Sequence, residues 1–379
     1  MRTPGPLIVT PLAARRFLRR VLGFDRPHAN IAAALAHHGY IQVDPLNICG
    51  RMHDLILRNR VAGYREGDLM RFLHGEVTPL PPEQRRGFEH HVPGTGILAA
   101  FPLEAWPHLL AAMRDWSRTR GVWAGRLTPR EKALAGDLLV EIRARGPLGS
   151  EDFDDARRAR KVWGAAKLVK ATLQKLFFHG RVLIAQRTSH RRRYDLPERV
   201  LPPALLAQTE ASPNETARWL ALLKVRQRRL VTLKREDLRL IGDSVHPVTV
   251  EGCPPLYCLP EDVGVLASSG DSPEIDAVAA VSLLAPLDPL IYDRRLTAAL
   301  WGFDYTWEAY TPPLKRVRGH YALPVLAGTG ILGHVNPKAD RSQRRLVITS
   351  RRIRRGHNVG PALHEFAAWL GLSVKNTDR

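Results

Sequence analysis

A carboxamide and a carboxylate two residues apart, Gln42 and Asp44, are the first residues whose types and spacing could do chemistry. The segment 40–44, YIQVD, has the composition of a short strand and is followed by a proline. Side chains of a strand alternate between its two faces, so we expect both polar groups on one face. Such a pair could hold a water molecule. It could equally be two solvated residues on an edge strand.

Other signatures of enzymes are missing from the sequence. There is no G-x-x-x-x-G-K-[ST] phosphate loop, no H-E-x-x-H zinc helix and no set of kinase motifs. GTGIL occurs at 94–98 and at 328–332, without the strand-to-helix context of a phosphate site, and we expect a turn at each. Adjacent histidines at 37–38 and 90–91 do not share a helix face, and we expect them at the surface or lining a groove. The amide–carboxylate pair therefore remains the best candidate site.

The charge of the chain favours a polyanionic partner. Its 379 residues carry a formal net charge of +20, with a sequence pI near 10.6. A G+C-rich coding bias would exchange Lys for Arg, but it would not obviously create such a surplus. The length favours two to four domains, because a single core rarely grows to this size.

The cysteine count and the hydropathy of the chain indicate in which cellular compartment the protein is expected. Three cysteines, Cys49, Cys253 and Cys258, make neither a disulfide framework nor a zinc-ligand spacing. No segment approaches the roughly eighteen unbroken apolar residues of a membrane span. The N-terminal segment lacks the apolar region of a signal peptide. These features predict a cytoplasmic, nucleoid-associated protein with reduced thiols and no membrane partner.

The elements that must position the pair are short. Thr10 and Pro11 are typical of a helix start, and Asn30 and Gly39 of the start and end of a second helix. The strand 40–44 follows, and apolar spacing predicts a further helix over 52–64. Helix, helix, strand and helix at this spacing are typical of a winged-helix unit.

A similar unit recurs in the middle of the chain. Helices are expected from Thr128 to Gly146, from Ser150, and over 163–180, where Lys167, Lys170 and Lys175 lie on the polar side. A hairpin should follow, with an apolar strand, a turn near Thr188-Ser189 and a return strand containing Arg191, Arg192 and Arg193. Three helices and a basic hairpin indicate a winged helix, in which one helix and the wing usually meet DNA. A helical domain with a surface hairpin is the alternative.

The remainder of the chain changes from helix to strand. A basic helix and two strands suggest a shorter third unit, and ASSGDSPE at 267–274 is the clearest linker. Short strands are then expected at 281–292, 305–312, 319–328, 330–338 and 344–353, before a final helix at 359–372. The fold class is thus α+β, with tandem winged-helix domains and a C-terminal β-rich, barrel-like domain. The predicted domains are 1–125, 126–210, 211–270 and 271–379.

Two long segments carry a resemblance to a known family. GYIQVDPLNICGRMHDLILRNR resembles the QxD segment of the YcaQ/AlkZ group of winged-helix DNA glycosylases, and LLAPLDPLIYDRRLTAALWGFDYTWEAYTPPLKRVRGHYALPVLAGTGILGHVNPKADR resembles the same family. The resemblance covers most of the chain and is weakest at 210–268. The last motif position, Gln or Asp in the family, is Asp44 here, nearer YcaQ than AlkZ, whose motif is Q-x-Q. Met52, where a small residue is expected, and the short third unit are departures that bear on lesion preference.

The resemblance implies a metal-independent, monofunctional DNA glycosylase with Gln42 and Asp44 as catalytic residues and no cofactor. The family hydrolyses the N-glycosidic bond of alkylated purines, including N7-linked interstrand crosslinks, so alkylated or crosslinked double-stranded DNA is the implied partner. N7-alkylguanine and N3-alkyladenine are the implied bases. We expect a monomer. DNA contacts are expected from basic residues, some at matching family positions: Arg51, His53, Arg60, Lys167, Lys170, Arg191, Arg192, Arg193, Arg341, Arg344 and Arg345.

The chemistry is consistent with that implication. An N7-alkylguanine is already cationic, so its departure needs little acid catalysis. A carboxylate at Asp44 could stabilise the sugar cation and accept a proton from water, which Gln42 could orient. The main alternative is a non-enzymatic winged-helix regulator, which would prefer a DNA sequence over damage. An RNA-processing protein is a third possibility, although no RRM or KH signature is present.

Overall fold

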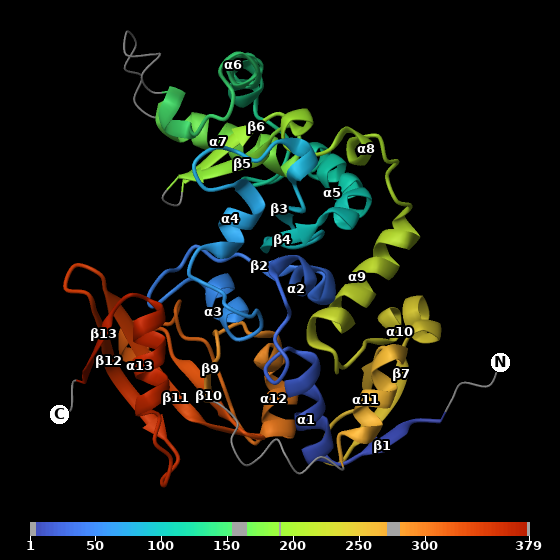
Figure 1. Cartoon of the computed structure of the whole chain (residues 1–379). Helices are drawn as coiled ribbons and strands as arrows, with labels where there is room; N and C mark the ends of the chain where they lie inside the picture. Colours follow the sequence, from blue (N-terminus) through green and yellow to red (C-terminus); the bar gives the residue numbers. More distant parts are fainter. Residues whose placement is uncertain (1–4, 154–164, 189–190, 271–280, 377–379) are drawn as a thin grey trace. The chain divides into compact units, whose positions relative to one another are not determined.

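The structure is a computed structural model and describes residues 5–153, 165–188, 191–270 and 281–376 (Figure 1). Its contacts divide the chain into two compact units, each assembled from separate segments. Unit 1 comprises Met1–Gly39, Val43–Glu66 and Ala221–Arg379, and unit 2 comprises Tyr40–Gln42 and Gly67–Leu220. The chain passes between them several times, and the four sequential domains expected above remain a prediction. The mixed α+β class is confirmed.

The two N-terminal helices lie in unit 1 with the expected caps. The helix α1 (Pro11–Val21) begins where Thr10 Oγ1 accepts a hydrogen bond from the amide of Ala13 at 3.1 Å. The helix α2 (Ile31–His38) begins at Asn30, whose Oδ1 accepts from the amide of Ala33 at 2.9 Å. It ends at Gly39, whose φ of 77° is left-handed and favours glycine. Both helix predictions are confirmed.

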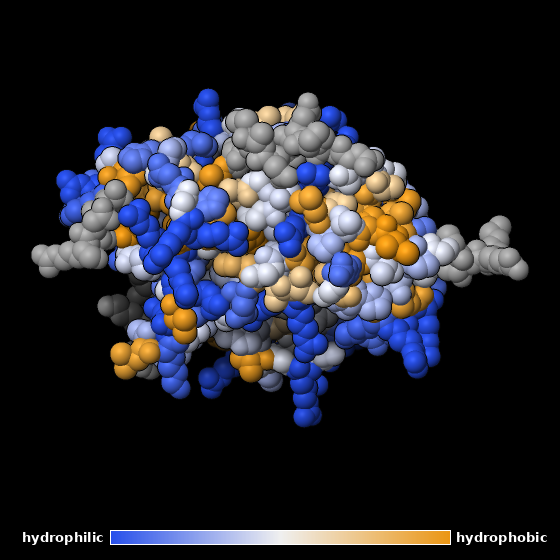
Figure 2. Space-filling model, turned by 90° about the horizontal axis from the view of Figure 1, so that it is seen from below, coloured by the Kyte–Doolittle hydropathy of each residue, from blue (hydrophilic) through white to orange (hydrophobic). Residues whose placement is uncertain are grey.

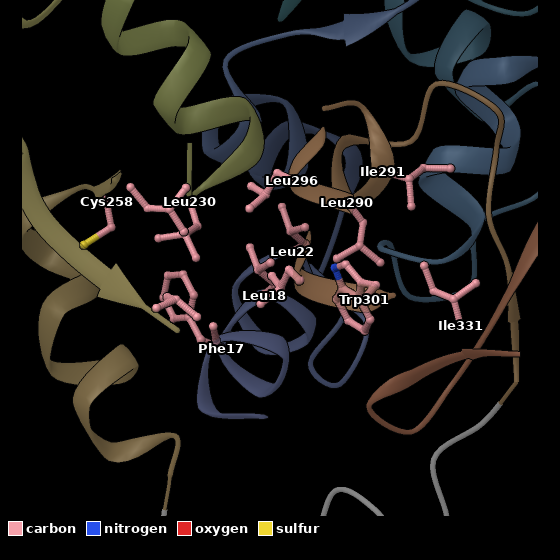
Figure 3. Close-up of a cluster of buried hydrophobic side chains, with 14 of the residues drawn as sticks. Phe17, Leu18, Leu22, Leu230, Cys258, Leu290, Ile291, Leu296, Trp301 and Ile331 are labelled. Carbon is pink, nitrogen blue, oxygen red and sulfur yellow. The ribbon is translucent and has the colours of Figure 1, made fainter. Parts of the chain in front are cut away.

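The core around α1 draws on residues far apart in the sequence (Figure 3). Phe17, Leu18 and Leu22 form the buried side of α1. They belong to one cluster with Leu230 and with Trp301 of α12 (Arg294–Trp301). Burial of such side chains contributes about 1.5–3 kcal/mol each, so α1 is held mainly by packing. The cluster joins the N-terminal segment to the last third of the chain within unit 1.

A small sheet accompanies this core, in the order β1-β7-β8. The strand β1 (Leu7–Val9) pairs in parallel with β7 (His246–Val250), which pairs in antiparallel with β8 (Leu256–Cys258). The hairpin of β7 and β8 is the pair of strands predicted for the short third unit. The short helices α10 (Arg235–Ile241) and α11 (Val263–Ser268) flank it in the sequence.

The C-terminal part of unit 1 is a five-stranded sheet in the order β13-β12-β11-β10-β9. Its strands are β9 (Ser282–Leu283), β10 (Leu323–Ala327), β11 (Gly330–Asp340), β12 (Arg345–Ile353) and β13 (Ser373–Asn376). The final helix α13 (Gly360–Trp369) packs Leu363 and Phe366 into the same cluster as the sheet. The sheet curls into a half-barrel, as expected for a β-rich domain.

Several strand predictions in this region need correction. The segment 305–312 is not a strand although its aromatic residues favour one, and prolines at 312 and 313 start a 3-10 turn directly after it. The predicted strand 281–292 is limited to β9, and a 3-10 turn at Pro289–Ile291 follows. Conversely, β13 lies beyond the predicted final helix and was not expected; it pairs in parallel with β12. Both GTGIL segments contain turns, as predicted.

Unit 2 is built around a three-stranded sheet, β2-β4-β3. The strand β2 (Ile41–Gln42) pairs with β4 (Leu98–Pro102), which pairs with β3 (Gly87–His91). The helices of unit 2 are α4 (Asp68–His74), α5 (Trp106–Arg118), α6 (Pro129–Arg145), α7 (Ala165–Phe178) and α8 (Pro203–Leu206). The helix α9 (Pro213–Arg228) then leads back into unit 1.

The middle of unit 2 confirms most of the predicted element order. A capping box at Thr128 starts α6, and a single 3-10 turn begins at Ser150. The hairpin has β5 (Leu183–Thr188) antiparallel to β6 (Arg191–Asp195). The predicted turn includes Ser189, and the predicted helix begins at 163; both positions lie outside the described residues.

The histidine pairs are more buried than expected. His38, His90 and His91 are all buried, so a surface or groove-lining position for them is wrong. His90 Nε2 lies 2.9 Å from the carbonyl oxygen of Phe177, and the ring of His91 stacks on Phe178 at 3.7 Å. Burial lowers the pKa of His90 to about 4, so it is neutral at pH 7. His90 and His91 stabilise the interior of unit 2, and His38 lies in the interior of unit 1.

Candidate active site

Gln42 lies at the end of the short strand β2. It pairs across the sheet with Ala99 of β4. Its side chain is half-buried, and the oxygen Oε1 is buried without a hydrogen-bond partner among the residues that the structure describes. A buried amide oxygen left unpaired costs about 1–3 kcal/mol, so it is a strong acceptor for a water or substrate group.

Asp44 lies just beyond the strand, which ends at Gln42 and not at Asp44 as predicted. The cause is local: Asp44 Oδ1 accepts a hydrogen bond from the amide of Leu46 at 2.9 Å, and Pro45 lies between them. Such a turn competes with continued strand pairing. The predicted alternation persists in burial, because Ile41 and Val43 are buried while the two polar residues are not. Two residues of chain span at most about 7 Å, so the two polar groups stay close.

The electrostatic setting of Asp44 favours proton transfer. Burial raises the pKa of its carboxyl above the ordinary value of 3.8, and the hydrogen bond from the Leu46 amide opposes that rise. No cationic side chain pairs with Asp44 among the described residues. A carboxylate with a raised pKa is a stronger base than an ordinary one, and it is free to take up positive charge.

The segment after Asp44 packs into the C-terminal part of unit 1. Leu46, Ile48 and Cys49 belong to the same apolar cluster as Tyr321. The carbonyl oxygen of Ile48 accepts a hydrogen bond from the amide of Ala339 in β11 at 2.8 Å. The catalytic candidate is thereby fixed to a sheet nearly 300 residues later in the chain.

Two aromatic side chains, Tyr321 close to Asp44 and Trp307 in contact with Tyr321, were not found from the sequence. Tyr321 is fully buried, and its hydroxyl has no hydrogen-bond partner among the described residues. Burial raises its pKa well above the ordinary value, and the charges of Cys49 and Asp44 raise it further. The ring of Trp307 meets that of Tyr321 edge to face at 6.2 Å, and its indole N–H is also buried and unpaired within the described chain. The only sequence signal was their presence in the long family-like segment.

The basic residues that follow Asp44 do not gather at the surface. Arg60 is fully buried, and its guanidinium binds both carboxylate oxygens of Asp288 at 2.5 and 2.9 Å. His53 is also fully buried, beside Asp54. Arg51 is half-buried at the start of α3 (Met52–Arg58). As placed, Arg60 and His53 stabilise the interior and have no surface to offer a phosphate.

The expected DNA contacts in unit 2 have different exposures. Lys167 and Lys170 are exposed on α7, and Arg191 is exposed on β6. The expected place of Lys175 on the polar side of this helix is wrong, because its side chain is buried and pairs with Glu131 at 2.8 Å. Arg192 is half-buried over the ring of Phe177. The guanidinium of Arg193 donates to the carbonyl oxygen of Pro147 and pairs with Asp152 at 3.0 Å. Of the three hairpin arginines, Arg191 is the most available to a phosphate.

In unit 1, the turn between β11 and β12 presents exposed arginines at Arg341, Arg344 and Arg345. Arg341 pairs with Glu66 at 2.5 Å. Arg344 has a φ of 52°, a left-handed conformation unusual for a side chain other than glycine. The face drawn in Figure 2 is mostly hydrophilic, with hydrophobic side chains in small separate groups.

No group of three or more His, Cys, Asp or Glu side chains in the described part of the chain is arranged to hold a metal ion. Within the same residues, no helix is both long enough and apolar enough to span a membrane.

Comparisons with known proteins agree with this geometry. The profile of the family described as "DNA glycosylase AlkZ-like" matches residues 35–372. The solved structure of the Streptomyces sahachiroi DNA glycosylase AlkZ is similar, with a TM-score of 0.59 and 14% sequence identity. That match covers 98% of this chain and 100% of the AlkZ chain, and at this identity it shows a shared fold. Since the family profile covers nearly the whole chain, the protein belongs to the AlkZ-like family of DNA glycosylases.

Proposed function

We propose that this DNA glycosylase hydrolyses the N-glycosidic bond of cationic alkylated purines, with Asp44 and Gln42 as its catalytic residues. The proposal rests on two neighbouring polar groups. The half-buried carboxylate of Asp44 has no cationic partner among the described residues, and the amide oxygen of Gln42 has no hydrogen-bond donor there. A carboxylate stabilises positive charge developing on the sugar, and an amide oxygen orients a water by accepting one of its protons.

The proposed reaction balances without a metal. The bond between C1′ of the sugar and the base nitrogen breaks, and its electron pair leaves with the base. Because an N7-alkylguanine or N3-alkyladenine carries a positive charge, it departs as a neutral molecule. A water oxygen then bonds to C1′, and its proton passes to Asp44. The enzyme is then monofunctional, because water and not an amine of the protein attacks the sugar.

Interstrand crosslinks through N7 present the same bond and the same charge. We propose that the enzyme unhooks such crosslinks, whose second base remains attached to the opposite strand. A base tethered in this way cannot swing fully into a closed pocket. Catalysis by two short polar groups on one strand end suits such a substrate, because it does not require the base to be enclosed.

We assign the binding of DNA phosphates to exposed basic residues of both units. In unit 2, α6, the 3-10 turn at 150, α7 and the β5–β6 hairpin follow the order of a winged helix. Lys167, Lys170 and Arg191 are among its exposed cations. In unit 1 we assign the same role to Arg344, Arg345 and Arg341, although Arg341 must leave Glu66 to bind a phosphate. Contacts to phosphates give affinity without sequence preference, which suits an enzyme that searches for damage as a monomer.

Single-turnover base release from a duplex with one N7-methylguanine tests the proposal. We expect Asp44→Asn to lower the rate by about 10²–10⁴ and Gln42→Ala by about tenfold, with duplex binding retained. Gln208→Ala and Asp243→Asn, at exposed positions, are matched controls that should keep the wild-type rate. The second substrate is an N7-crosslinked duplex, with strand separation as the readout. Tight binding without release from either duplex would sink the proposal and favour a non-enzymatic DNA binder.

A further inference from the structure

Exposed large apolar side chains concentrate in one loop of unit 1. Among the described residues, nine such side chains are exposed, and three of them occur within eight positions. Tyr310, Leu314 and Val317 are 77%, 102% and 80% exposed. We call these three residues the apolar tip. Soluble proteins rarely expose several large apolar side chains close together. Where they do, the exposed apolar area usually marks a surface that contacts another molecule.

Hydrogen bonds within the loop hold the backbone that carries the apolar tip. Glu308 is buried, and its Oε2 accepts hydrogen bonds from the amides of Arg318 and Gly319 at 2.8 and 3.1 Å. Arg316 Nε donates to the carbonyl oxygen of Thr311 at 2.8 Å. Prolines at 312 and 313 restrict the backbone further. The exposed side chains are therefore presented by a rigid support, which lowers the entropy cost of inserting them.

Basic residues alternate with the apolar tip along the loop. Lys315 is exposed between Leu314 and Arg316, which is half-exposed, whereas Arg318 is paired with Asp304 at 3.4 Å. In a protein of net charge +20, Lys315 and Arg316 complement a polyanion. Apolar residues that alternate with cations fit a DNA duplex, in which phosphates flank the stacked bases.

Aromatic contacts connect the apolar tip to the catalytic carboxylate. The ring of Tyr310 meets that of Trp307 edge to face at 5.5 Å, and Trp307 meets Tyr321 at 6.2 Å. Tyr321 in turn lies close enough to Asp44 to respond to its charge. The exposed tip is thus two ring contacts from a side chain at the proposed reaction centre, all within unit 1.

We propose that the apolar tip inserts into duplex DNA beside the damaged base, while Lys315 and Arg316 hold the flanking phosphates. This inference rests on the proposed function and identifies a second part of the same site. Apolar wedges separate a base step and bend the duplex. A separated step would expose the sugar of the lesion to Asp44 without enclosing a base that is tethered to the opposite strand.

Insertion is measured by the fluorescence of 2-aminopurine placed next to the N7-methylguanine, because this base brightens when its stacking is disrupted. We expect wild-type protein to raise the fluorescence on binding. The double variant Leu314→Ser/Val317→Ser should lose the rise and release the base about tenfold more slowly. Ile8→Ser is the matched control, since Ile8 is 78% exposed on β1 of the same unit, and it should behave as wild type.

The salt dependence of DNA binding distinguishes the contribution of the Lys315 cation from that of the apolar side chains. Lys315→Ala should reduce the slope of log affinity against log salt by about 1, whereas the apolar double variant should leave that slope unchanged. The inference is overturned if wild-type protein does not raise the fluorescence, or if the double variant raises it as fully as wild type. Failure of the proposed function would look different: no base release, with or without the fluorescence rise.

Discussion

Two acidic side chains, the buried Glu89 in unit 2 and the half-buried Asp44 in unit 1, have opposite surroundings. Glu89 Oε1 accepts hydrogen bonds from His74 at 2.7 Å and from Arg187 at 2.6 Å, and Arg187 also binds its second oxygen. Arg85 closes the network through the other ring nitrogen of His74 at 3.1 Å. Asp44 receives one backbone hydrogen bond and has no cationic partner in the described chain.

The pKa values express this difference. Burial alone would raise the pKa of Glu89, but the charge and hydrogen bonds of Arg187 hold it well below the ordinary value of 4.5. Burial raises the pKa of Asp44, and only an amide opposes it. A buried acid that is fully paired stabilises a fold, whereas one left without a cation is available for chemistry. Counting buried charges alone would not separate these two roles.

The largest expected effect comes from breaking the paired acid. Glu89→Ala leaves Arg187 and His74 without their shared partner in the interior, and this should destabilise the protein by about 3–5 kcal/mol in urea unfolding. Because the pKa of Glu89 is lowered in the folded state, its contribution is present above pH 4.5 and lost as the pH falls below that value. Asp44→Asn, by contrast, should not lower the free energy of unfolding at neutral pH. Equal losses of the free energy of unfolding in Glu89→Ala and Asp44→Asn would show that the two side chains contribute alike to stability.

Two buried tyrosines of unit 1 also differ in whether their polar group is paired within the protein, and smaller changes in stability are expected from replacing them. Tyr64 donates its hydroxyl proton to Asp54 at 2.6 Å, whereas the hydroxyl of Tyr321 is unpaired within the described residues. Tyr64→Phe should destabilise the protein by about 1–3 kcal/mol, because a buried carboxylate loses a donor. Tyr321→Phe should change the stability by less than about 0.5 kcal/mol.

Base release should respond to the two tyrosine variants in the reverse order. We expect the unpaired hydroxyl of Tyr321 to donate to the Asp44 carboxylate during the reaction and so to favour its ionised form. Tyr321→Phe should then slow release at low pH and shift the pH midpoint upward. Tyr64→Phe should leave that midpoint unchanged. A Tyr321 variant with lower stability and an unshifted midpoint would identify a purely structural side chain.

The sequence predicted local features of the fold better than the surroundings of the site. Thr10, Asn30 and Gly39 mark helix ends through contacts within a few residues, so their types suffice. The sequence placed Gln42 and Asp44 on one strand, but that strand ends at Gln42, and their catalytic role stays a prediction. The turn at Asp44 depends on a side chain that competes with strand pairing, which periodicity does not register.

Long-range contacts account for what the sequence did not predict. Tyr321 and Trp307 meet the Asp44 segment only after the chain has left unit 1 and returned to it. Arg60 resembles a DNA contact in its local sequence, but it is neutralised by Asp288, more than two hundred residues later. Charge and proximity along the chain therefore do not show whether a side chain faces solvent or the interior.

The pH dependence of base release tests the state of Asp44 directly. The proposed reaction needs the ionised carboxylate, so the single-turnover rate should fall about tenfold per pH unit below its folded pKa. Because burial raises that pKa, the midpoint should lie above 3.8. The residual rate of Asp44→Asn should be independent of pH over the same range. A wild-type rate that stays flat down to pH 4 would show that this carboxylate does not accept the proton.

The smallest expected effect concerns the arginines of the β5–β6 hairpin, which differ as the two acids do. Arg193 is occupied by Pro147 and Asp152, whereas Arg191 is exposed on the same strand. A cation already paired within the protein releases few counterions from DNA, so Arg191→Ala should lower the salt slope of duplex binding by about 1 and Arg193→Ala should not. Fluorescence anisotropy across a salt series measures both. Equal slopes for the two variants would mean that pairing in the free protein does not decide which arginines meet phosphates.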